Sequence, residues 1–384
     1  MIFSIFIIFF GAALLSTFAL VTRQSMLVAY IVLGVLLGPY CLKAFPNSQF
    51  VQSVGEVGII FLLFLLGMHL PIQKLMLMLR KVTPVGLVSS IIFAAIGYLV
   101  AHFSGLATGE SIIVGLAMMF SSTIIGIKLL PTTVLHHQHT GEVMISVLLF
   151  QDIIAIIVLL ILQSIMSKSH LVGDILLVVL GFPAVTVIAF IFERYVLMRL
   201  FSRFNRIKEY IFLLAIAWCL SLSELASLLG LSSEIGAFIA GVSLAANPVS
   251  LYMAESLKPL RDFFLVMFFF AVGATFNLHY FPKIIIPALI LLILLLIIKP
   301  AVYYWLLKWV GESKPVAWEV GVRLAQVSEF SLIIAYVGMD LKVISETAGY
   351  LIEATTILSF MISSYWVVMR YPTPIAISDR LRRD

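Results

Sequence analysis

Asp152 is the strongest candidate in this chain for a chemical function, because it lies in the middle of a long apolar run. The run VMISVLLFQDIIAIIVLLIL spans residues 143–162 and holds no other charged residue. A carboxylate at that depth of a membrane helix costs about 3 kcal/mol on insertion scales, so it is expected to have a function. Such a group can hold a proton or a cation but not both, which is the physical basis of proton-coupled exchange. We therefore predict that Asp152 binds the proton and also the transported metal cation.

The partners of Asp152 can be sought among the other polar residues within apolar runs. Gln151, directly before it, is neutral, so the motif carries one charge where a pair of acids would carry two. Lys299, in the apolar run 291–300, is the natural partner of a buried acid. Lys299 could instead extend its ammonium group to the cytoplasmic surface. Asp152 could also be only a structural acid that such a partner neutralises.

Two other runs, 110–130 and 316–338, have small polar residues at their centres. The residues are Ser121, Ser122 and Thr123 in the first run and Gln326, Ser328 and Glu329 in the second. Small hydroxyl residues at mid-membrane favour a local interruption of the helix, where freed carbonyls can face a cation. They could equally bond back to the preceding turn within a continuous helix.

The remaining charges near the membrane centre offer supporting roles. Arg323 and Glu329 do not share a face of a continuous helix, but they could meet across an interruption or compensate half-helix ends. Glu319 is an ordinary i,i+4 partner for Arg323. We interpret Glu56 and Glu353, near the ends of their runs, as water-facing or capping residues. Histidines at 136, 137 and 139 could sense pH or bind a metal, although a solvated loop is the simpler interpretation.

The composition identifies an all-α polytopic membrane protein. The chain has 384 residues, 62% hydrophobic and 11% charged, whereas soluble domains are about 25% charged. Apolar runs and their punctuation predict about thirteen membrane spans. Most Lys and Arg residues fall on one set of alternate connections, which places the N-terminus outside and the C-terminus in the cytoplasm. The net charge of +5 thus reflects topology and does not indicate nucleic-acid binding.

Internal sequence similarity indicates an inverted repeat of six spans in each half. Gly-Val-x-Leu followed by proline occurs at residues 34–39 and again, more loosely, at 241–248. An aromatic-rich run into a glycine occurs at 61–67 and again at 268–273. In both pairs the two similar segments are separated by the same odd number of spans, so the copies have opposite orientations in the membrane. Inverted repeats of this kind are typical of secondary transporters, whose sites lie where interrupted helices meet.

Several segments resemble one family of transporters. FSSTIIGIKLL (120–130) and LLFQDIIAI (148–156) resemble the Kef-type branch of the second cation/proton antiporter family, which includes antiporters of the NapA type. The further matching segments are LGVLLGP (33–39), VGIIFLLFLLGMHL (57–70), EIGAFIAGVSL (234–244), FFLVMFFFAVGATFNL (263–278) and RLAQVSEFSLIIA (323–335). They cover nearly the whole chain in order.

The resemblance implies a transporter membrane domain over residues 1–370 with crossed, interrupted helices in a core part. The implied parts are a core of 83–165 and 284–369, a dimerisation part of 1–82 and 209–278, a linker helix and cytoplasmic loop of 173–208, and a short cytoplasmic tail of 371–384. It implies that Asp152 binds cation and proton, that Lys299 can pair with it, and that the interrupted helices at 121–123 and at Glu329 complete the site. It also implies a homodimer and an elevator-type motion.

We therefore expect an antiporter, not an enzyme, that exchanges K+ or Na+ for H+ across a bacterial inner membrane without a cofactor. The sequence after Arg370 has no G-x-G-x-x-G motif, so we expect regulation, if present, to come from a separate cytoplasmic subunit. Three alternatives stay open: a channel or uniporter not coupled to protons, a cation-coupled symporter for an organic solute, and a membrane sensor. Gln151, where electrogenic sodium exchangers have a second Asp, leaves the ion and the stoichiometry open.

Overall fold

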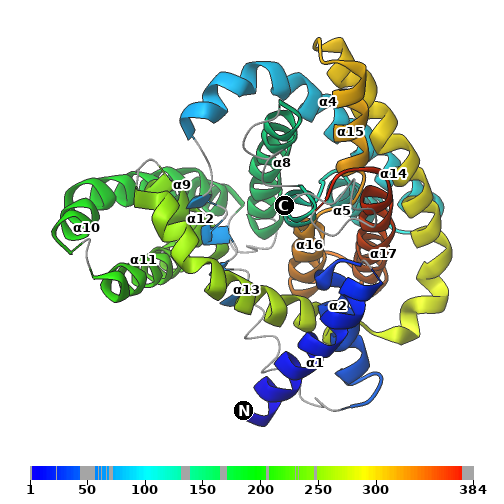
Figure 1. The fold of residues 1–384 in the computed structure, drawn as a ribbon, viewed down its shortest axis with the longest axis horizontal. Coiled ribbons are helices and arrows are strands. Elements are labelled where there is room, and N and C mark those ends of the chain that lie inside the picture. The colour runs from blue at the N-terminus through cyan, green and yellow to red at the C-terminus, as the bar shows by residue number, and fades with distance from the viewer. Residues whose placement is uncertain are drawn as a thin grey trace. The chain divides into compact units, whose positions relative to one another are not determined.

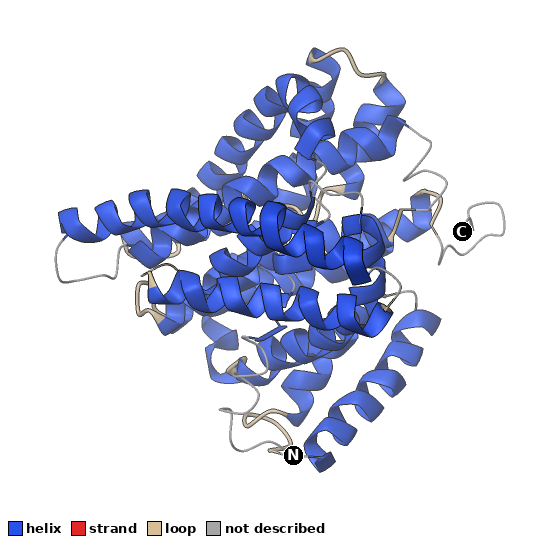
Figure 2. Cartoon of the chain, turned by 90° about the vertical axis from the view of Figure 1, so that its left-hand side faces the viewer, coloured by secondary structure: helices blue, strands red, loops and turns tan. Residues whose placement is uncertain are grey.

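The fold is that of a computed structural model. It describes residues 2–22, 24–43, 57–58, 60–61, 63–65, 67–68, 72–130, 139–164, 171–204, 207–229, 231, 233–245 and 249–373. Every element of secondary structure in these ranges is a helix (Figures 1 and 2). The predicted all-α membrane fold is therefore confirmed, while the count of thirteen spans stays a prediction. Glu56, His136 and His137 lie outside the described residues.

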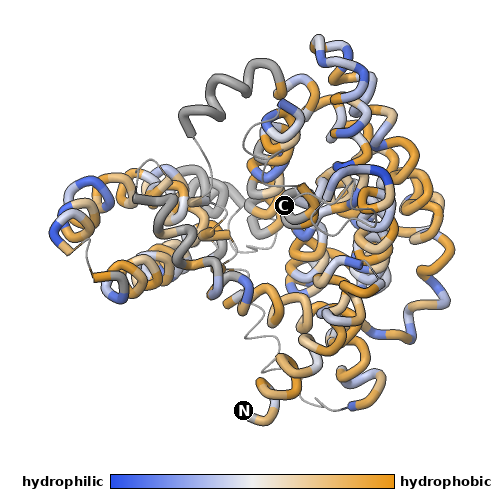
Figure 3. Tube along the Cα trace, viewed as in Figure 1, coloured by the Kyte–Doolittle hydropathy of each residue, from blue (hydrophilic) through white to orange (hydrophobic). Residues whose placement is uncertain are grey.

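Six of the described helices are long and apolar enough to cross a membrane by length and composition. A membrane helix satisfies every backbone polar group within itself, so apolar side chains can face lipid. These segments are Phe3–Val21, Val82–Phe103, His139–Leu159, Glu209–Leu228, Leu278–Trp309 and Glu346–Arg370. Figure 3 shows the pattern on α14 (Phe281–Trp309), which is apolar along most of its length with hydrophilic residues beyond its ends. We conclude that the chain is an integral membrane protein.

The described chain falls into two compact units. One unit comprises residues 1–48, 76–158 and 272–384, and the other comprises 49–75 and 159–271. The helices of the first unit are α1 (Ile2–Val21), α2 (Met26–Leu37), most of α4 (Ile72–Phe103), α5 (Thr108–Met118), α6 (Thr123–Lys128), most of α8 (His139–Ser164), η2 (Leu278–Tyr280), α14, α15 (Lys314–Arg323), α16 (Glu329–Asp340) and α17 (Glu346–Arg370). Those of the second are α9 (Leu171–Phe192), η1 (Glu193–Leu197), α10 (Met198–Phe204), α11 (Lys208–Leu228), α12 (Ser233–Ala245) and most of α13 (Val249–Thr275).

Two helices of the first unit are interrupted where the sequence places small polar residues. The chain leaves the helical conformation between α5 and α6, at residues 119–122, and again between α15 and α16, at residues 324–328. Ser122 caps α6 by accepting from the Ile125 amide at 3.1 Å, and Ser328 caps α16 by accepting from the Phe330 amide at 3.2 Å. A serine at the start of a helix satisfies an amide that has no partner within the helix. Both predicted interruptions are therefore confirmed.

Glycines allow two close helix crossings that the predicted repeat would relate to each other. In the second unit, a Cβ on Gly241 would collide with the Phe64 carbonyl oxygen. In the first unit, a Cβ on Gly273 would collide with the Ile31 carbonyl oxygen. The repeat pairs the segment of Gly241 with that of Ile31, and the segment of Phe64 with that of Gly273. The same backbone-to-backbone approach thus occurs twice, each time between a segment of one half and a segment of the other, which supports the inverted repeat.

Candidate ion-binding site

The candidate site lies within the first unit, where three segments far apart in the sequence meet. Asp152 on α8 is only 2% exposed. The Thr123 hydroxyl, at the first position of α6, lies 3.1 Å and 3.2 Å from the two carboxylate oxygens of Asp152 and donates to them. The Glu329 carboxyl, at the first position of α16, is near enough to interact electrostatically with Asp152. The acid is thus associated with the starts of the second halves of both interrupted helices.

Lys299 occupies a different position from the one expected. Its side chain is fully buried, which rules out extension to the surface. The ammonium nitrogen lies 2.6 Å from the Phe120 carbonyl oxygen and 3.1 Å from the Gln326 carbonyl oxygen, and it donates to both. The Phe93 ring covers it, with the nitrogen 5.2 Å from the ring centroid. The expected ion pair with Asp152 is absent among the described residues, because the lysine instead satisfies carbonyls freed by both interruptions.

Gln151 fixes the first interruption to α14. Its amide nitrogen donates to the Tyr303 hydroxyl at 2.8 Å and to the Met119 carbonyl at 3.2 Å. Its amide oxygen accepts from the Ser121 backbone amide at 3.0 Å. Both amide donors and the carbonyl of the side chain are therefore used by the protein. This neutral residue positions the non-helical backbone, so it acts on the site through Ser121 and Tyr303.

The two interruptions also bond to each other. The Ser121 hydroxyl donates to the Leu324 carbonyl at 2.9 Å, and the Gln326 amide nitrogen donates to the Ser122 carbonyl at 3.4 Å. The Ser331 hydroxyl donates to the Ala117 carbonyl, which links α16 to α5. In a membrane, backbone groups outside a helix must find partners within the protein. These reciprocal bonds supply such partners for the carbonyls of Leu324 and Ser122.

Four residues of this network were not anticipated from the sequence as parts of the site. Tyr303 lies one turn after Lys299 on α14 and thus on the same helix face. Ser359 on α17 accepts from the Val327 amide at 3.0 Å, and Ser363 donates to the Gln326 side-chain oxygen at 2.9 Å. Phe93 on α4 completes the set through its contact with Lys299. Ser359 and Ser363 are four residues apart on α17 and therefore share a helix face, and this spacing is the signal that could have indicated a polar face.

Arg323 compensates the end of a half-helix rather than meeting Glu329. It is the last residue of α15, and its guanidinium pairs with Glu319 at 2.8 Å. It also donates to the Leu129 carbonyl at 3.1 Å and to the Pro372 carbonyl at 3.0 Å. A cation at a helix C-terminus is favourable because the free carbonyls there carry partial negative charge. Of the two pairings considered, the structure has the i,i+4 pair with Glu319.

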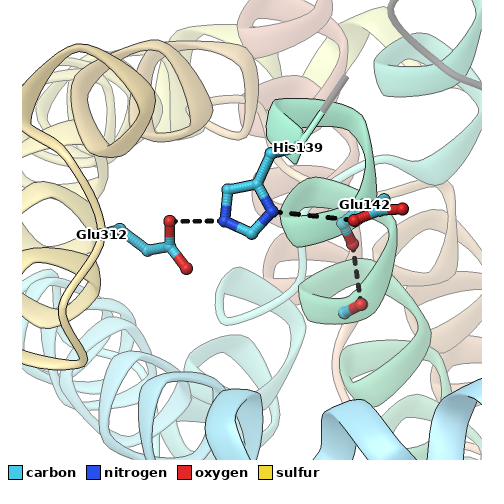
Figure 4. Close-up of polar contacts among 4 residues, drawn as sticks. His139, Glu142 and Glu312 are labelled. Atoms are coloured by element: carbon cyan, nitrogen blue, oxygen red, sulfur yellow. Dashed lines mark hydrogen bonds and ion pairs between the residues drawn. The ribbon is translucent and has the colours of Figure 1, made fainter. Parts of the chain in front are cut away.

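The histidine of the 136–139 cluster that the structure describes makes a separate polar contact (Figure 4). His139 begins α8, the helix of Asp152. Its Nε2 atom lies 2.7 Å from the Glu312 carboxylate, and its Nδ1 atom lies 3.6 Å from the Glu142 carboxylate. Glu312 belongs to the turn between α14 and α15. The contact joins the start of α8 to that turn, away from the carbonyls around Lys299.

Glu353 is the clearest departure from the sequence interpretation. It was expected to face water or to cap a helix, but only 2% of it is exposed. It lies about two turns inside α17, where neighbouring helices cover it. The interpretation as a water-facing residue is therefore wrong, because burial is decided by helix packing and not by distance from a helix end.

Comparison with known proteins gives a consistent result. The model of the transmembrane sodium/hydrogen exchanger family matches residues 5–369. An iron transporter, MagA, of Paramagnetospirillum magneticum is 28% identical over 90% of this chain and 80% of its own length. K(+) efflux antiporter 5 of Arabidopsis thaliana is 28% identical over 88% of this chain, which spans 61% of that relative. The ammonium/H(+) antiporter subunit AmhT of Alkalihalophilus pseudofirmus is 30% identical over 80% of this chain and 79% of its own length.

A solved structure shares the fold. The sodium/proton antiporter MjNhaP1 of Methanocaldococcus jannaschii superimposes with a TM-score of 0.74 over 95% of this chain and 96% of its own, at 17% sequence identity.

Proposed function

Because the chain belongs to the sodium/hydrogen exchanger family of membrane proteins, we propose that it is a secondary antiporter that exchanges K+ or Na+ for H+. The named relatives are transporters rather than enzymes. The observation that carries the proposal is the buried Asp152 carboxylate, with the Thr123 hydroxyl as its hydrogen-bond donor, at the junction of two interrupted helices.

In this proposal Asp152 binds a proton and a cation alternately. One hydroxyl donor leaves further lone pairs on the two carboxylate oxygens for a proton or for an ion. Hydroxyl oxygens of Ser122 and Thr123, and carbonyls at the interruptions, are the neutral ligands near the acid. Binding of one ligand displaces the other, so movement of the loaded acid across the membrane couples the two fluxes.

Lys299 and Gln151 support the site. Lys299 holds the carbonyls of Phe120 and Gln326 together while Asp152 is protonated or occupied. Competition of the lysine for Asp152 would require it to leave these carbonyls in another step of the cycle. Gln151 keeps the interruption in place, as Arg323 and Glu329 do at the facing half-helix ends. These assignments retain Asp152 as the residue that binds the transported ion.

A monovalent cation suits this site best. The buried ammonium group of Lys299 already lies in the network, so a divalent ion would bring more positive charge beside it than a monovalent ion does. K+ and NH4+ carry the same charge and are close in size, and the relatives include a K(+) efflux antiporter and an ammonium/H(+) antiporter subunit. We keep K+ or Na+ as the proposed substrate, with NH4+ as an ion to include in the assay.

The proposal extends to the motion, the assembly and the location of the protein. The interruptions at 119–122 and 324–328, Asp152 and Lys299 all lie within the proposed core of 83–165 and 284–369, and their hydrogen bonds link several segments of it. We propose an elevator in which the core of 83–165 and 284–369 slides against a dimerisation part of 1–82 and 209–278 within a homodimer. We also propose an inner-membrane location with the N-terminus outside, and a separate regulatory subunit in the cytoplasm.

The test is transport by purified protein in liposomes that contain a pH dye. An imposed K+ or Na+ gradient should drive proton movement, and Asp152→Asn should abolish it. Asp340→Asn, which changes an exposed carboxylate at the end of α16, is the matched control and should transport normally. Cation flux without proton movement in the wild type would indicate a channel or uniporter. Coupled flux that persists in Asp152→Asn would remove Asp152 from the proposed role.

A further inference from the structure

Glu353 is a buried acid that the proposed site does not use. Among the described residues, its Oε2 atom is buried and has no hydrogen-bond partner. A carboxylate without a donor in an apolar interior is strongly unfavourable, so the carboxyl is expected to carry a proton in this conformation. A buried group can take part in proton transport only if its proton can exchange with water.

A series of polar side chains leads from the surface to Glu353. Glu346, in the first turn of α17, is exposed and hydrogen-bonds the Tyr280 hydroxyl. The Tyr280 ring packs on that of Tyr350, with centroids 5.1 Å apart. Tyr350 interacts electrostatically with Glu353, three residues further along α17. Glu346, Tyr350 and Glu353 are spaced by four and three residues, so they lie on one face of the helix.

The gradient of burial follows the same order. Glu346 is exposed, Tyr280 is partly buried, Tyr350 is 7% exposed and Glu353 is 2% exposed. Hydroxyl and carboxyl groups are the side chains that can pass a proton. Exposure to water therefore decreases from Glu346 at the surface to Glu353 in the interior.

Beyond Glu353, α17 continues with hydroxyls that reach the interruption. The Ser359 hydroxyl donates to the Thr356 carbonyl at 2.8 Å and accepts from the Val327 amide. Six residues of helix separate Glu353 from Ser359, a rise of about 9 Å. The buried acid is thus on the helix that contacts residues 324–328.

We propose that Glu353 is a second proton-binding group of this chain, distinct from Asp152, and that its proton exchanges with water at the membrane face where α17 begins, by way of Tyr350, Tyr280 and Glu346. The proposal deepens the proposed function, on which it rests for its role in transport. Proton binding at Glu353 can still be tested without transport.

Other titratable groups at this end of the packed helices must be considered. They are Tyr40 after α2, Glu110 at the start of α5, Lys283 at the start of α14, Asp340 at the end of α16, and Lys342 after α16. Glu110 accepts from the Ser345 amide at 2.7 Å, and Lys283 lies 6.0 Å from the Tyr280 ring centroid. Tyr40 and Lys283 lie near Tyr280, and among the described residues Tyr350 is the titratable group that interacts with Glu353.

Infrared spectroscopy of the purified protein tests the proton site. A protonated buried carboxylic acid has a carbonyl band that carboxylates lack. We expect such a band in Asp152→Asn and its loss in Asp152→Asn/Glu353→Gln. An unchanged band in the double variant would overturn the proposal. If the glutamine variant does not fold, Glu353→Asp should shift the band, and an unshifted band would overturn the proposal equally.

Hydrogen–deuterium exchange of the same band tests the path. After transfer to heavy water, the band should shift several-fold more slowly in Tyr350→Phe and in Glu346→Gln. Glu312→Gln, which changes a carboxylate beyond the opposite end of α14, should exchange at the rate of the parent. Equal rates in all variants would exclude the path. A band that is present without coupled transport in the wild type would instead refute the proposed function alone.

Discussion

The ammonium nitrogen of Lys299 lies 2.6 Å from the carbonyl oxygen of Phe120, a backbone group that the first helix interruption leaves free. The same nitrogen donates to the Gln326 carbonyl at the second interruption. One buried cation therefore joins both interruptions, and a structural role for this lysine stands beside any role in ion exchange. The stability of the protein should reveal which role is the larger.

We expect Lys299→Met to destabilise the protein. Methionine has a similar length but no donor, so two buried carbonyls lose their partner at a cost of about 1–3 kcal/mol each. The thermal unfolding temperature of the detergent-purified protein should fall by several degrees, whereas Lys308→Met, at an exposed position on the same helix, should leave it unchanged. An unchanged unfolding temperature with an altered pH profile of transport would show that Lys299 acts through its charge on Asp152.

The bond between Gln151 and Tyr303 should appear as a coupling energy. Gln151→Leu removes three hydrogen bonds, and Tyr303→Phe removes the shared hydroxyl. The double variant should lose less free energy of unfolding than the sum of the single variants, by about 0.5–3 kcal/mol. Chemical unfolding of the four proteins measures the difference. Strict additivity would mean that the amide does not position the first interruption through Tyr303.

Thr123 should tune cation binding at Asp152. Thr123→Val keeps the shape of the side chain but removes the hydroxyl that donates to the carboxylate. A hydrogen bond to a charged group contributes about 1.5–3 kcal/mol, so the half-saturating cation concentration in the liposome assay should rise about tenfold or more. Thr123→Ser retains the donor and is the matched control. Equal behaviour of the valine and serine variants would contradict a role for the hydroxyl.

The contact of His139 with Glu312 should contribute modestly to stability, because the Nε2 atom of the imidazole lies 2.7 Å from the carboxylate. A pair near the surface contributes about 0.2–1 kcal/mol. We expect Glu312→Gln to lower the unfolding temperature of the purified protein by about a degree or two. An unchanged unfolding temperature would show that the contact does not stabilise the fold. Glu209→Gln, at an exposed position on α11, controls for the loss of a surface carboxylate.

The helix interruptions could be predicted because their cause is local. Ser121, Ser122 and Ser328 offer side chains that replace backbone partners at mid-membrane, and the structure interrupts the helices at these residues. Asp152 could be identified as an unusual acid because a carboxylate in an apolar run is costly wherever the helix lies. Both inferences need only the residues that flank these positions in the sequence.

The partners of the buried charges could not be predicted in the same way. Lys299 was expected to pair with Asp152, yet carbonyls from two other segments approach it more closely. Arg323 has its i,i+4 partner, which was foreseen, but also carbonyls of Leu129 and Pro372, which depend on packing. Glu353 was expected to meet water because it lies near a helix end, and neighbouring helices bury it instead.

The sequence by itself determined the membrane class, the family, the two interruptions and the presence of an acid, Asp152, within an apolar helix. Apolar length and small polar residues act along the chain, so their consequences can be followed without knowledge of the packing. Tertiary structure alone decided which acceptors receive the Lys299 donors, that Gln151 is held by Tyr303 and Ser121, and that Glu353 is buried. The physical reason is that a buried polar group takes its partners from whatever the neighbouring helices present, and the order of the chain does not encode that choice locally.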